Sequence, residues 1–299
     1  MPPKPTRANW IAILSLGLIW GGTFMVVSLA LRGYGPFTVA CARTTLGAIA
    51  LLSLMIVLRR PLPTRDALLA TALIGPLNTA IPFALLAWGQ QYVPSAFAGI
   101  SMAVLPLLIL PLAHFFSDEK MSLHKFYGVS LGFLGAVLLI GPSALEIGQG
   151  HHALGQLACL GATMCYAISS VMTRRCPPID SITLAAFTLV FGAIWIIPAM
   201  LWIEGVPEIS DFNSSLAILF LGFVPTAFAA YLRVSVVRTA GSVFMTNVNY
   251  QVPLWSVLFG TLILGETLPW RFFAALAIIL CGLVISQGKN PIRVLVNRA

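Results

Sequence analysis

Hydrophobic residues along this chain gather in ten runs, each close to the length that crosses a bilayer as a helix. A hydrocarbon core of about 30 Å takes about 20 helical residues. Short segments rich in Pro, Gly, Asp and Arg separate the runs. We therefore predict an all-α polytopic membrane protein whose ten transmembrane helices lie near residues 9–31, 36–58, 66–90, 93–117, 122–141, 151–174, 180–203, 212–236, 241–263 and 269–288.

The basic residues predict the orientation of these helices. With a cytoplasmic N-terminus, fourteen Lys and Arg residues lie on the inner side, whereas the outer loops hold only Arg32 and Arg271. Cytoplasmic loops of membrane proteins carry such an excess of positive charge. We therefore expect a multi-pass protein of the cell (inner) membrane with both termini cytoplasmic, which requires an even number of helices.

The two halves of the chain resemble each other in sequence. A shift of 147 residues aligns 75–141 with 222–288 without a gap. Five predicted helices per half give the second copy the opposite orientation, an arrangement typical of secondary transporters that bind substrate near the midplane. We predict two inverted five-helix repeats, 1–146 and 147–299. The informative matches are Gly75/Gly222, Thr79/Thr226, Pro106/Pro253, Glu119/Glu266, Gly135/Gly282 and Gly141/Gly288.

The composition agrees with a membrane protein and excludes several other classes. Of the 299 residues, 59% are hydrophobic and only 9% are charged, against about 25% charged in soluble domains. The net charge is +8, but no basic cluster accompanies a nucleic-acid-binding motif, so we expect no nucleic-acid partner. The five cysteines are scattered and lack the spacing of metal ligands, which predicts neither a metal site nor a disulfide.

The residues needed for catalysis are missing. All nine acidic residues fall in predicted loops or at helix ends. We find no Ser/His/Asp set, paired carboxylates or phosphate loop, and we therefore predict no enzymatic activity and no cofactor. Proton-coupled transporters usually carry a carboxylate within the membrane, so this sequence offers no evident proton carrier. His114 lies at a helix end, where an interfacial residue is the ordinary interpretation.

One stretch, residues 241–253, is unusually polar for a transmembrane helix. Asn247, Tyr250 and Gln251 are spaced to share one helix face. Polar groups at this depth need a protein partner or a ligand. A structural duty common to both halves would have kept similar residues, so we predict that this face lines a substrate site. The matching positions in the first half are apolar: Ile100, Ala103 and Val104.

Arg43 is the one charge within a predicted helix, about 10 Å along it from Pro36 at ~1.5 Å per residue. It could be structural, reaching the membrane surface or bonding carbonyls of a broken helix. It could also anchor a substrate carboxylate. For each single Asn, Ser or Thr near the midplane, an interhelical hydrogen bond is the alternative to ligand binding. The remaining binding candidates are Trp20, Asn78, Ser101, Tyr166 and Thr226.

Glycines and prolines predict further features of the helices. The pairs Gly17/Gly21 and Gly128/Gly132 have the small-xxx-small spacing that lets two helices approach closely. Pro106 and Pro253 interrupt matched helices of the two halves. Proline removes a backbone hydrogen bond, so these two residues are candidate hinges, with static kinks as the alternative.

The chain resembles the drug/metabolite transporter superfamily, specifically its ten-span EamA-type members, over nearly its whole length. The matching residues are Trp20-Gly21 with Phe24, Pro36 with Arg43, the segment from Ala87 to Ala98, Pro106, Glu119, Gly128 and Gly135, and then Pro253, Glu266 and Gly282. This resemblance implies a central cavity among the first, third, fourth, sixth, eighth and ninth helices, with the fifth and tenth at the periphery. It looks most similar to the bacterial aromatic-amino-acid exporters. Unlike four-span multidrug relatives, the chain lacks an intramembrane Glu.

We therefore expect a transporter that exports small metabolites, namely amino acids including aromatic ones, by alternating access. The expected partners are a small-molecule substrate and the lipid bilayer, and we expect the protein to be a monomer. An exporter of drugs or other metabolites is the alternative within the same class. A membrane receptor or scaffold is the alternative from a different class, and it would bind a ligand without net flux.

Overall fold

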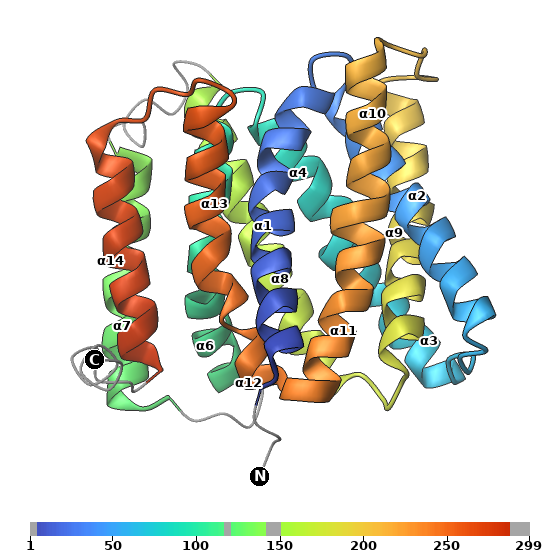
Figure 1. The fold of residues 1–299 in the computed structure, drawn as a ribbon, viewed down its shortest axis with the longest axis horizontal. Helices are drawn as coiled ribbons and strands as arrows, with labels where there is room; N and C mark the ends of the chain where they lie inside the picture. The colour runs from blue at the N-terminus through green and yellow to red at the C-terminus, as the bar shows by residue number, and fades with distance from the viewer. Residues whose placement is uncertain (1–4, 117–120, 142–150, 288–299) are drawn as a thin grey trace.

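The computed structural model describes residues 5–116, 121–141 and 151–287, and all regular structure in these ranges is helical (Figure 1). The prediction of an all-α membrane protein is therefore confirmed. Trp270–Ser286 is apolar but shorter than the other candidate spans. Within the described ranges, eight stretches are long and apolar enough to cross a bilayer: Arg7–Ala30, Pro36–Val57, Arg65–Gly89, Ser95–Phe116, Leu123–Ile140, His152–Arg175, Ser181–Ile203 and Phe212–Ala240.

Most predicted runs form one helix, and four are divided. The single helices are α1 (Arg7–Ala30), α2 (Pro36–Val57), α7 (Leu123–Ile140), α8 (His152–Arg175), α9 (Ser181–Ile203) and α14 (Trp270–Ser286). The divided ones are α3 (Arg65–Gly75), η1 (Pro76–Ala80) and α4 (Ile81–Gly89); α5 (Ser95–Ser101), η2 (Met102–Val104) and α6 (Leu105–Phe116); α10 (Phe212–Leu221), η4 (Gly222–Phe228) and α11 (Ala229–Ala240); and α12 (Ser242–Met245) with α13 (Val248–Leu262).

Polar residues at the ends of the apolar runs set where helices begin. The Thr6 hydroxyl accepts from the backbone N–H of Asn9 at the start of α1. Asp180 and Asp211 cap α9 and α10 in the same way. Such caps satisfy N–H groups that have no partner within the helix. Hydrogen bonds from Ser214 lower the pKa of the exposed Asp211 carboxyl.

Pro106 accounts for the irregular turn in the fourth run. Because proline has no N–H, the carbonyl of Met102 loses its normal helical partner four residues later. The N–H of Leu105 bonds to this carbonyl instead, which forms the short 3-10 segment η2. The break therefore precedes Pro106 by one turn.

The predicted continuous helix over 241–263 is wrong, because the chain breaks at residues 246–247. The backbone N–H of Asn247 bonds to the carbonyl of Phe244, and that of Asn249 bonds to the carbonyl of Thr246. These bonds span three residues rather than four. The Asn247 side chain also donates to the Phe244 carbonyl over 2.9 Å. A local side-chain bond of this kind competes with the helical pattern. The count of ten spans stays a prediction.

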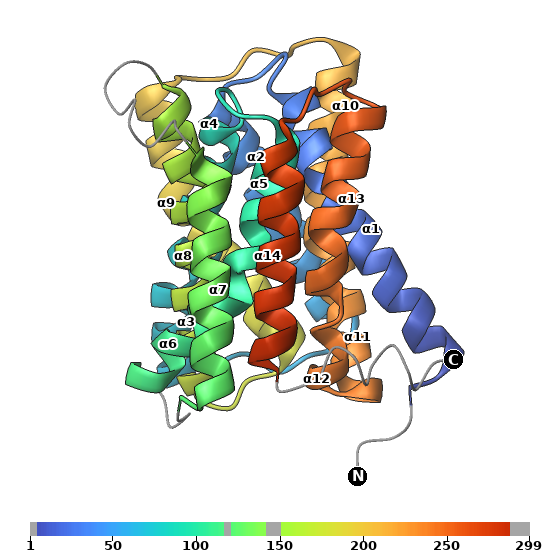
Figure 2. The same cartoon turned by 90° about the vertical axis from the view of Figure 1, so that its left-hand side faces the viewer.

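The helices stand side by side, with α1 beginning and α14 ending at the same end of the bundle (Figure 1). Helices α7 and α14 pack against each other at one edge (Figure 2). At this interface a Cβ on Gly128 would lie 2.5 Å from the carbonyl oxygen of Gly282. The predicted close approach through Gly128 and Gly132 is confirmed, since a Cβ on Gly282 would also lie 2.8 Å from the backbone nitrogen of Gly132.

At the opposite edge, α2 and α9 pack together and contact matched positions of the two halves. A Cβ on Gly47 of α2 would meet the Thr226 methyl group. A Cβ on Gly192 of α9 would overlap the Thr79 hydroxyl. Thr79 and Thr226 are one of the pairs aligned by the 147-residue shift, so equivalent residues make equivalent contacts. Glu119 and the predicted boundary between 146 and 147 lie outside the described residues.

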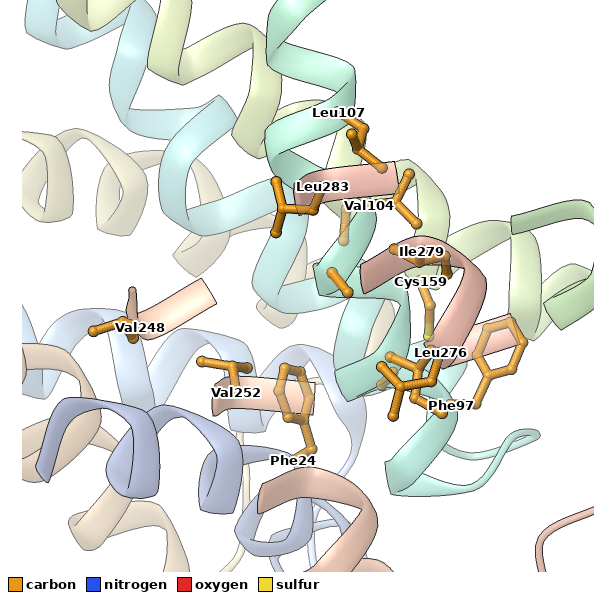
Figure 3. Close-up of a cluster of buried hydrophobic side chains, with 14 of the residues drawn as sticks. Phe24, Phe97, Val104, Leu107, Cys159, Val248, Val252, Leu276, Ile279 and Leu283 are labelled. Atoms are coloured by element: carbon orange, nitrogen blue, oxygen red, sulfur yellow. The ribbon is translucent and has the colours of Figure 1, made fainter. Parts of the chain in front are cut away.

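A large buried cluster, the central core, joins the helices at the middle of the bundle. Figure 3 shows Val248 and Val252 near Phe24, with Phe97 close to Leu276 (Figure 3). The side chains of Phe97 and Ile100 are completely buried. Gly17 and Gly21 of α1 bring α13 close to this core, because side chains there would overlap Gln251 and Trp255.

Two carboxylates of the second half cap helices of the first half. Glu204 accepts from the backbone N–H groups of Phe37 and Thr38 over 2.8 and 2.7 Å, at the start of α2. Glu266 accepts from the N–H groups of Ser95 and Ala96 over 2.6 and 3.1 Å, at the start of α5. A carboxylate favours the positive N-terminal end of a helix, and these contacts hold the halves together.

We predict that Gly128→Ala destabilises the protein, whereas Gly161→Ala does not. The new methyl group at position 128 collides with the backbone of α14, and overpacking of this kind costs about 1–3 kcal/mol. At Gly161 of α8 the nearest neighbour of a Cβ is a Leu85 methyl group at 3.6 Å, an ordinary contact. Thermal unfolding in detergent measures both variants. Equal melting temperatures for the two would contradict the close packing of α7 on α14.

Candidate functional site

The site is organised by η4, the π-helical segment that interrupts α10 and α11. Pro225 has no N–H, so the carbonyl of Leu221 loses its partner four residues later. The Thr226 hydroxyl donates to this carbonyl over 2.8 Å. A π-helical turn is frequent at functional sites because it presents backbone groups that a regular helix would use internally.

Arg43 of α2 reaches this segment. Its Nε donates to the Thr226 hydroxyl oxygen over 3.0 Å, and its guanidinium carbon lies 3.9 Å from the ring centroid of Phe83. The residue is only 9% exposed. The interpretation that Arg43 extends to the membrane surface is therefore wrong, because Thr226 and the ring of Phe83 hold it inside the bundle by a hydrogen bond and a cation–π contact.

Arg43 forms no ion pair with a carboxylate in the described part of the chain, where Asp180 is the acidic partner of both Arg60 and Arg238. A buried cation without a counter-charge is costly. The guanidinium also keeps donors that Nε does not use, because arginine carries five N–H groups. This arrangement can bind an anion.

Trp20 of α1 bonds to the same segment as Arg43. Its indole Nε1 donates to the carbonyl of Pro225 over 3.1 Å, next to Thr226. Trp20 of α1 and Arg43 of α2 are thus bonded to two consecutive residues of η4, Pro225 and Thr226. The structure brings the predicted residues Trp20, Arg43 and Thr226 together, although they are far apart in the sequence.

The three aromatic candidates pack against the same cluster. Trp20, Tyr166 and Tyr250 all contact the central core and stay partly exposed. Tyr166 also packs against a second cluster that contains Phe83, the residue whose ring lies under Arg43. Tyr166 therefore links the central core to the cluster beside the arginine.

Asn78 and Ser101 contact α8. The Asn78 side-chain oxygen accepts from the hydroxyl of Ser169 over 3.1 Å. The Ser101 hydroxyl donates to Ala98 in its own helix, while the Ser101 carbonyl accepts from Thr163 over 3.4 Å. The Asn78 bond is the interhelical contact that the sequence leaves open as the alternative to ligand binding, whereas the Ser101 hydroxyl bonds within its own helix.

The three residues of the predicted polar face have different surroundings. The side-chain nitrogen of Asn247 donates to Phe244, and Tyr250 packs against the central core. Gln251 lies against Gly17, and its buried side-chain oxygen has no hydrogen-bond partner among the described residues. An unpaired buried oxygen costs free energy, so Gln251 is the member of this face whose buried acceptor is free for a hydrogen bond.

The structure adds two residues that the sequence reasoning missed. Phe83 and Gln90 of the third run line a cavity of about 10 Å³ beside Arg43. Gln90 is 8% exposed, and its side-chain nitrogen has no hydrogen-bond partner in the described ranges. Their seven-residue spacing places both on one helix face. The sequence feature that could have identified Gln90 is its position as a polar residue at the end of an apolar run.

No three His, Cys, Asp or Glu residues gather among the described residues. The cysteines at 41, 159, 165, 176 and 281 are unpaired. Cys176 lies outside the helices, where burial raises the pKa of its thiol.

The fold and this site define a polytopic helical membrane protein with a polar, positively charged centre. The chain belongs to the EamA-like transporter family, which matches residues 9–141 and 153–287. It is therefore a membrane transporter, a multi-pass protein of the inner membrane. The resemblance to EamA-type members of the drug/metabolite transporter superfamily is confirmed.

Similar proteins span almost the whole chain. It is 24% identical to the uncharacterized transporter YoaV of Bacillus subtilis over 279 residues, which cover 92% of this chain and 95% of YoaV. It is 26% identical to the uncharacterized inner membrane transporter YedA of Escherichia coli K12, over 93% of this chain and 90% of YedA. It is 23% identical to protein PecM of Dickeya dadantii, over 90% of this chain and 89% of PecM. One crystal structure shares the fold with a TM-score of 0.66 and 20% sequence identity. The similarity covers 94% of this chain and 97% of the chain in that structure.

We predict that Thr226→Val destabilises the protein more than Thr79→Val. The first change removes the acceptor of Arg43 and leaves a buried charged donor unpaired, which costs about 1–3 kcal/mol. Thr79 is the matched control because its hydroxyl donates only to Gly75 in its own helix. Melting temperatures in detergent compare the variants. A larger loss for Thr79→Val would argue against the role assigned to Thr226.

Proposed function

We propose that this transporter exports small zwitterionic metabolites, namely amino acids including aromatic ones. The observation that carries the proposal is the buried guanidinium of Arg43, which has no carboxylate partner among the described residues and lies over the ring of Phe83. A substrate carboxylate would supply the missing charge through charge-assisted hydrogen bonds from nitrogens that Thr226 does not occupy.

The rest of the site matches the other parts of an amino acid. The free oxygen of Gln251 can accept from a substrate ammonium group. Aromatic residues around the central core can pack on an apolar or aromatic side chain; they are Trp20, Tyr166 and Tyr250.

Substrate binding on this proposal requires the helices to move. The cavity beside Arg43 has space for about one water molecule, far less than an amino acid occupies. We propose alternating access by two inverted five-helix halves, divided near residues 146–147. The break before Pro106 supports a hinge at that residue. Pro253 lies within α13, and the matched helix breaks at residues 246–247 instead, so we move the second proposed hinge to that break. The Glu204 and Glu266 caps supply contacts that would have to separate.

Uptake of labelled amino acids into proteoliposomes tests the substrate class. We expect flux of phenylalanine, and we expect Arg43→Gln to reduce it roughly 30-fold or more, as loss of a buried charge contact of about 2 kcal/mol implies. Arg43→Lys should retain part of the flux because it keeps the charge.

Phenethylamine, which is phenylalanine without its carboxylate, is the matched control ligand. The wild type should select phenylalanine over the amine, and Arg43→Gln should lose this selection. Flux of drugs or other metabolites without any amino acid would replace the proposed substrate class with the alternative one. Unchanged flux in Gln251→Ala would remove Gln251 from the site.

We further propose that transport follows the substrate gradient or proceeds by exchange. Among the described residues, Asp66 lies in the first turn of α3 at the end of its span, and the other carboxylates lie outside the helices: Asp180, Glu204, Glu208, Asp211 and Glu266. A proton carrier in a transporter is usually a carboxylate deeper within the membrane. A pH gradient alone should therefore drive no substrate accumulation in proteoliposomes, whereas preloaded unlabelled substrate should accelerate labelled uptake. Accumulation driven by pH would contradict this proposal and would point to His114.

A further inference from the structure

The small cavity beside Arg43 has an unusual lining. Three helices of the first half enclose it, and its polar side chains are Arg43, Gln90 and Thr23. The remaining lining is apolar: Phe24, Val27, Val39, Ala40, Phe83, Leu86 and Ala87. Its volume of about 10 Å³ admits one particle of about the size of a water molecule.

The polar groups around this cavity offer hydrogen-bond donors. The Gln90 side-chain oxygen already accepts from Ser28 over 3.3 Å, while its buried nitrogen bonds to none of the residues that the structure describes. Arg43 uses Nε for Thr226 and carries further N–H groups. The Thr23 hydroxyl donates to the carbonyl of Ile19 over 2.8 Å. The cavity thus joins an uncompensated cation to an unused amide donor.

We infer that this cavity binds a single chloride ion in the substrate-free transporter. A water molecule fits the volume but leaves the positive charge of Arg43 uncompensated in a region of low dielectric constant, where the cost is largest. A chloride ion is somewhat larger than a water molecule, so the apolar lining has to move slightly outward to admit it. The ion then accepts hydrogen bonds from every side and neutralises the guanidinium. Sulfate and phosphate have five heavy atoms and exceed the available space.

The chloride ion and the substrate carboxylate would then compete for Arg43. This competition rests on the proposed amino-acid function, whereas binding of the ion to the empty protein does not. Chloride would compensate the buried charge while the cavity is small, and the carboxylate would replace it when the site opens. Chloride should therefore raise the apparent Kd of the substrate.

Thermal unfolding of the purified full-length protein, without amino acids, tests the ion site. Chloride should raise the melting temperature by about 2–4 °C relative to gluconate at equal ionic strength, in a saturable manner, because it binds only the folded state. Arg43→Gln removes the cation and should abolish this rise. Gln90→Glu keeps Arg43 and adds an internal carboxylate at the cavity, so it should also abolish the chloride effect.

Gln91→Glu is the matched control, since it makes the same chemical change at an exposed neighbouring position. It should retain the full chloride effect. Absence of a chloride-dependent rise in the wild type would overturn the inference and would indicate water as the occupant. An unchanged rise in Gln90→Glu would also overturn it.

A competition measurement separates this inference from the proposed function. Phenylalanine binding is followed in chloride and in gluconate, and the apparent Kd should be several-fold higher in chloride. Phenylalanine binding that chloride leaves unaffected would overturn the competition while leaving the amino-acid function intact. A chloride-dependent melting temperature without any phenylalanine binding would support the ion site and count against the proposed function.

Discussion

A positive charge held inside an apolar helix bundle constrains the rest of the site. Arg43 is buried, and its charge in a low-dielectric region must be compensated by nearby dipoles, aromatic faces or anions. The Thr226 hydroxyl and the ring of Phe83 supply part of this compensation. The π-helical turn that places Thr226 is thus linked to the position of α2, and through Pro225 to Trp20 of α1.

Close packing around this centre depends on residues without side chains. Gly47 admits the methyl group of Thr226, and Gly192 admits the hydroxyl of Thr79 at the matched place in the other half. In a bilayer, helices gain little from excluding water, so close van der Waals contact and a few hydrogen bonds hold them together. Loop carboxylates such as Glu204 add charged caps at the helix ends.

Much of the fold could be predicted because bilayer thickness sets the length of apolar runs. The predicted run 36–58 appears as α2, and 180–203 appears as α9. The break at Asn247 could not be predicted from hydropathy, since it depends on a side-chain bond to Phe244. For the same reason hydropathy could not show that the Asn247 nitrogen bonds to the local backbone while the Gln251 oxygen is buried without a partner among the described residues.

The sequence by itself determined the class of protein, the approximate helix boundaries and the glycines at which α7 meets α14, because these follow from hydropathy and side-chain size along one chain. Tertiary structure decided the site. Arg43 could have extended to the membrane surface, but Thr226, 183 residues away, and the ring of Phe83 hold it inside. Gln90 became a candidate only through burial against Arg43, since an unpaired donor exists only once neighbouring helices exclude water from it.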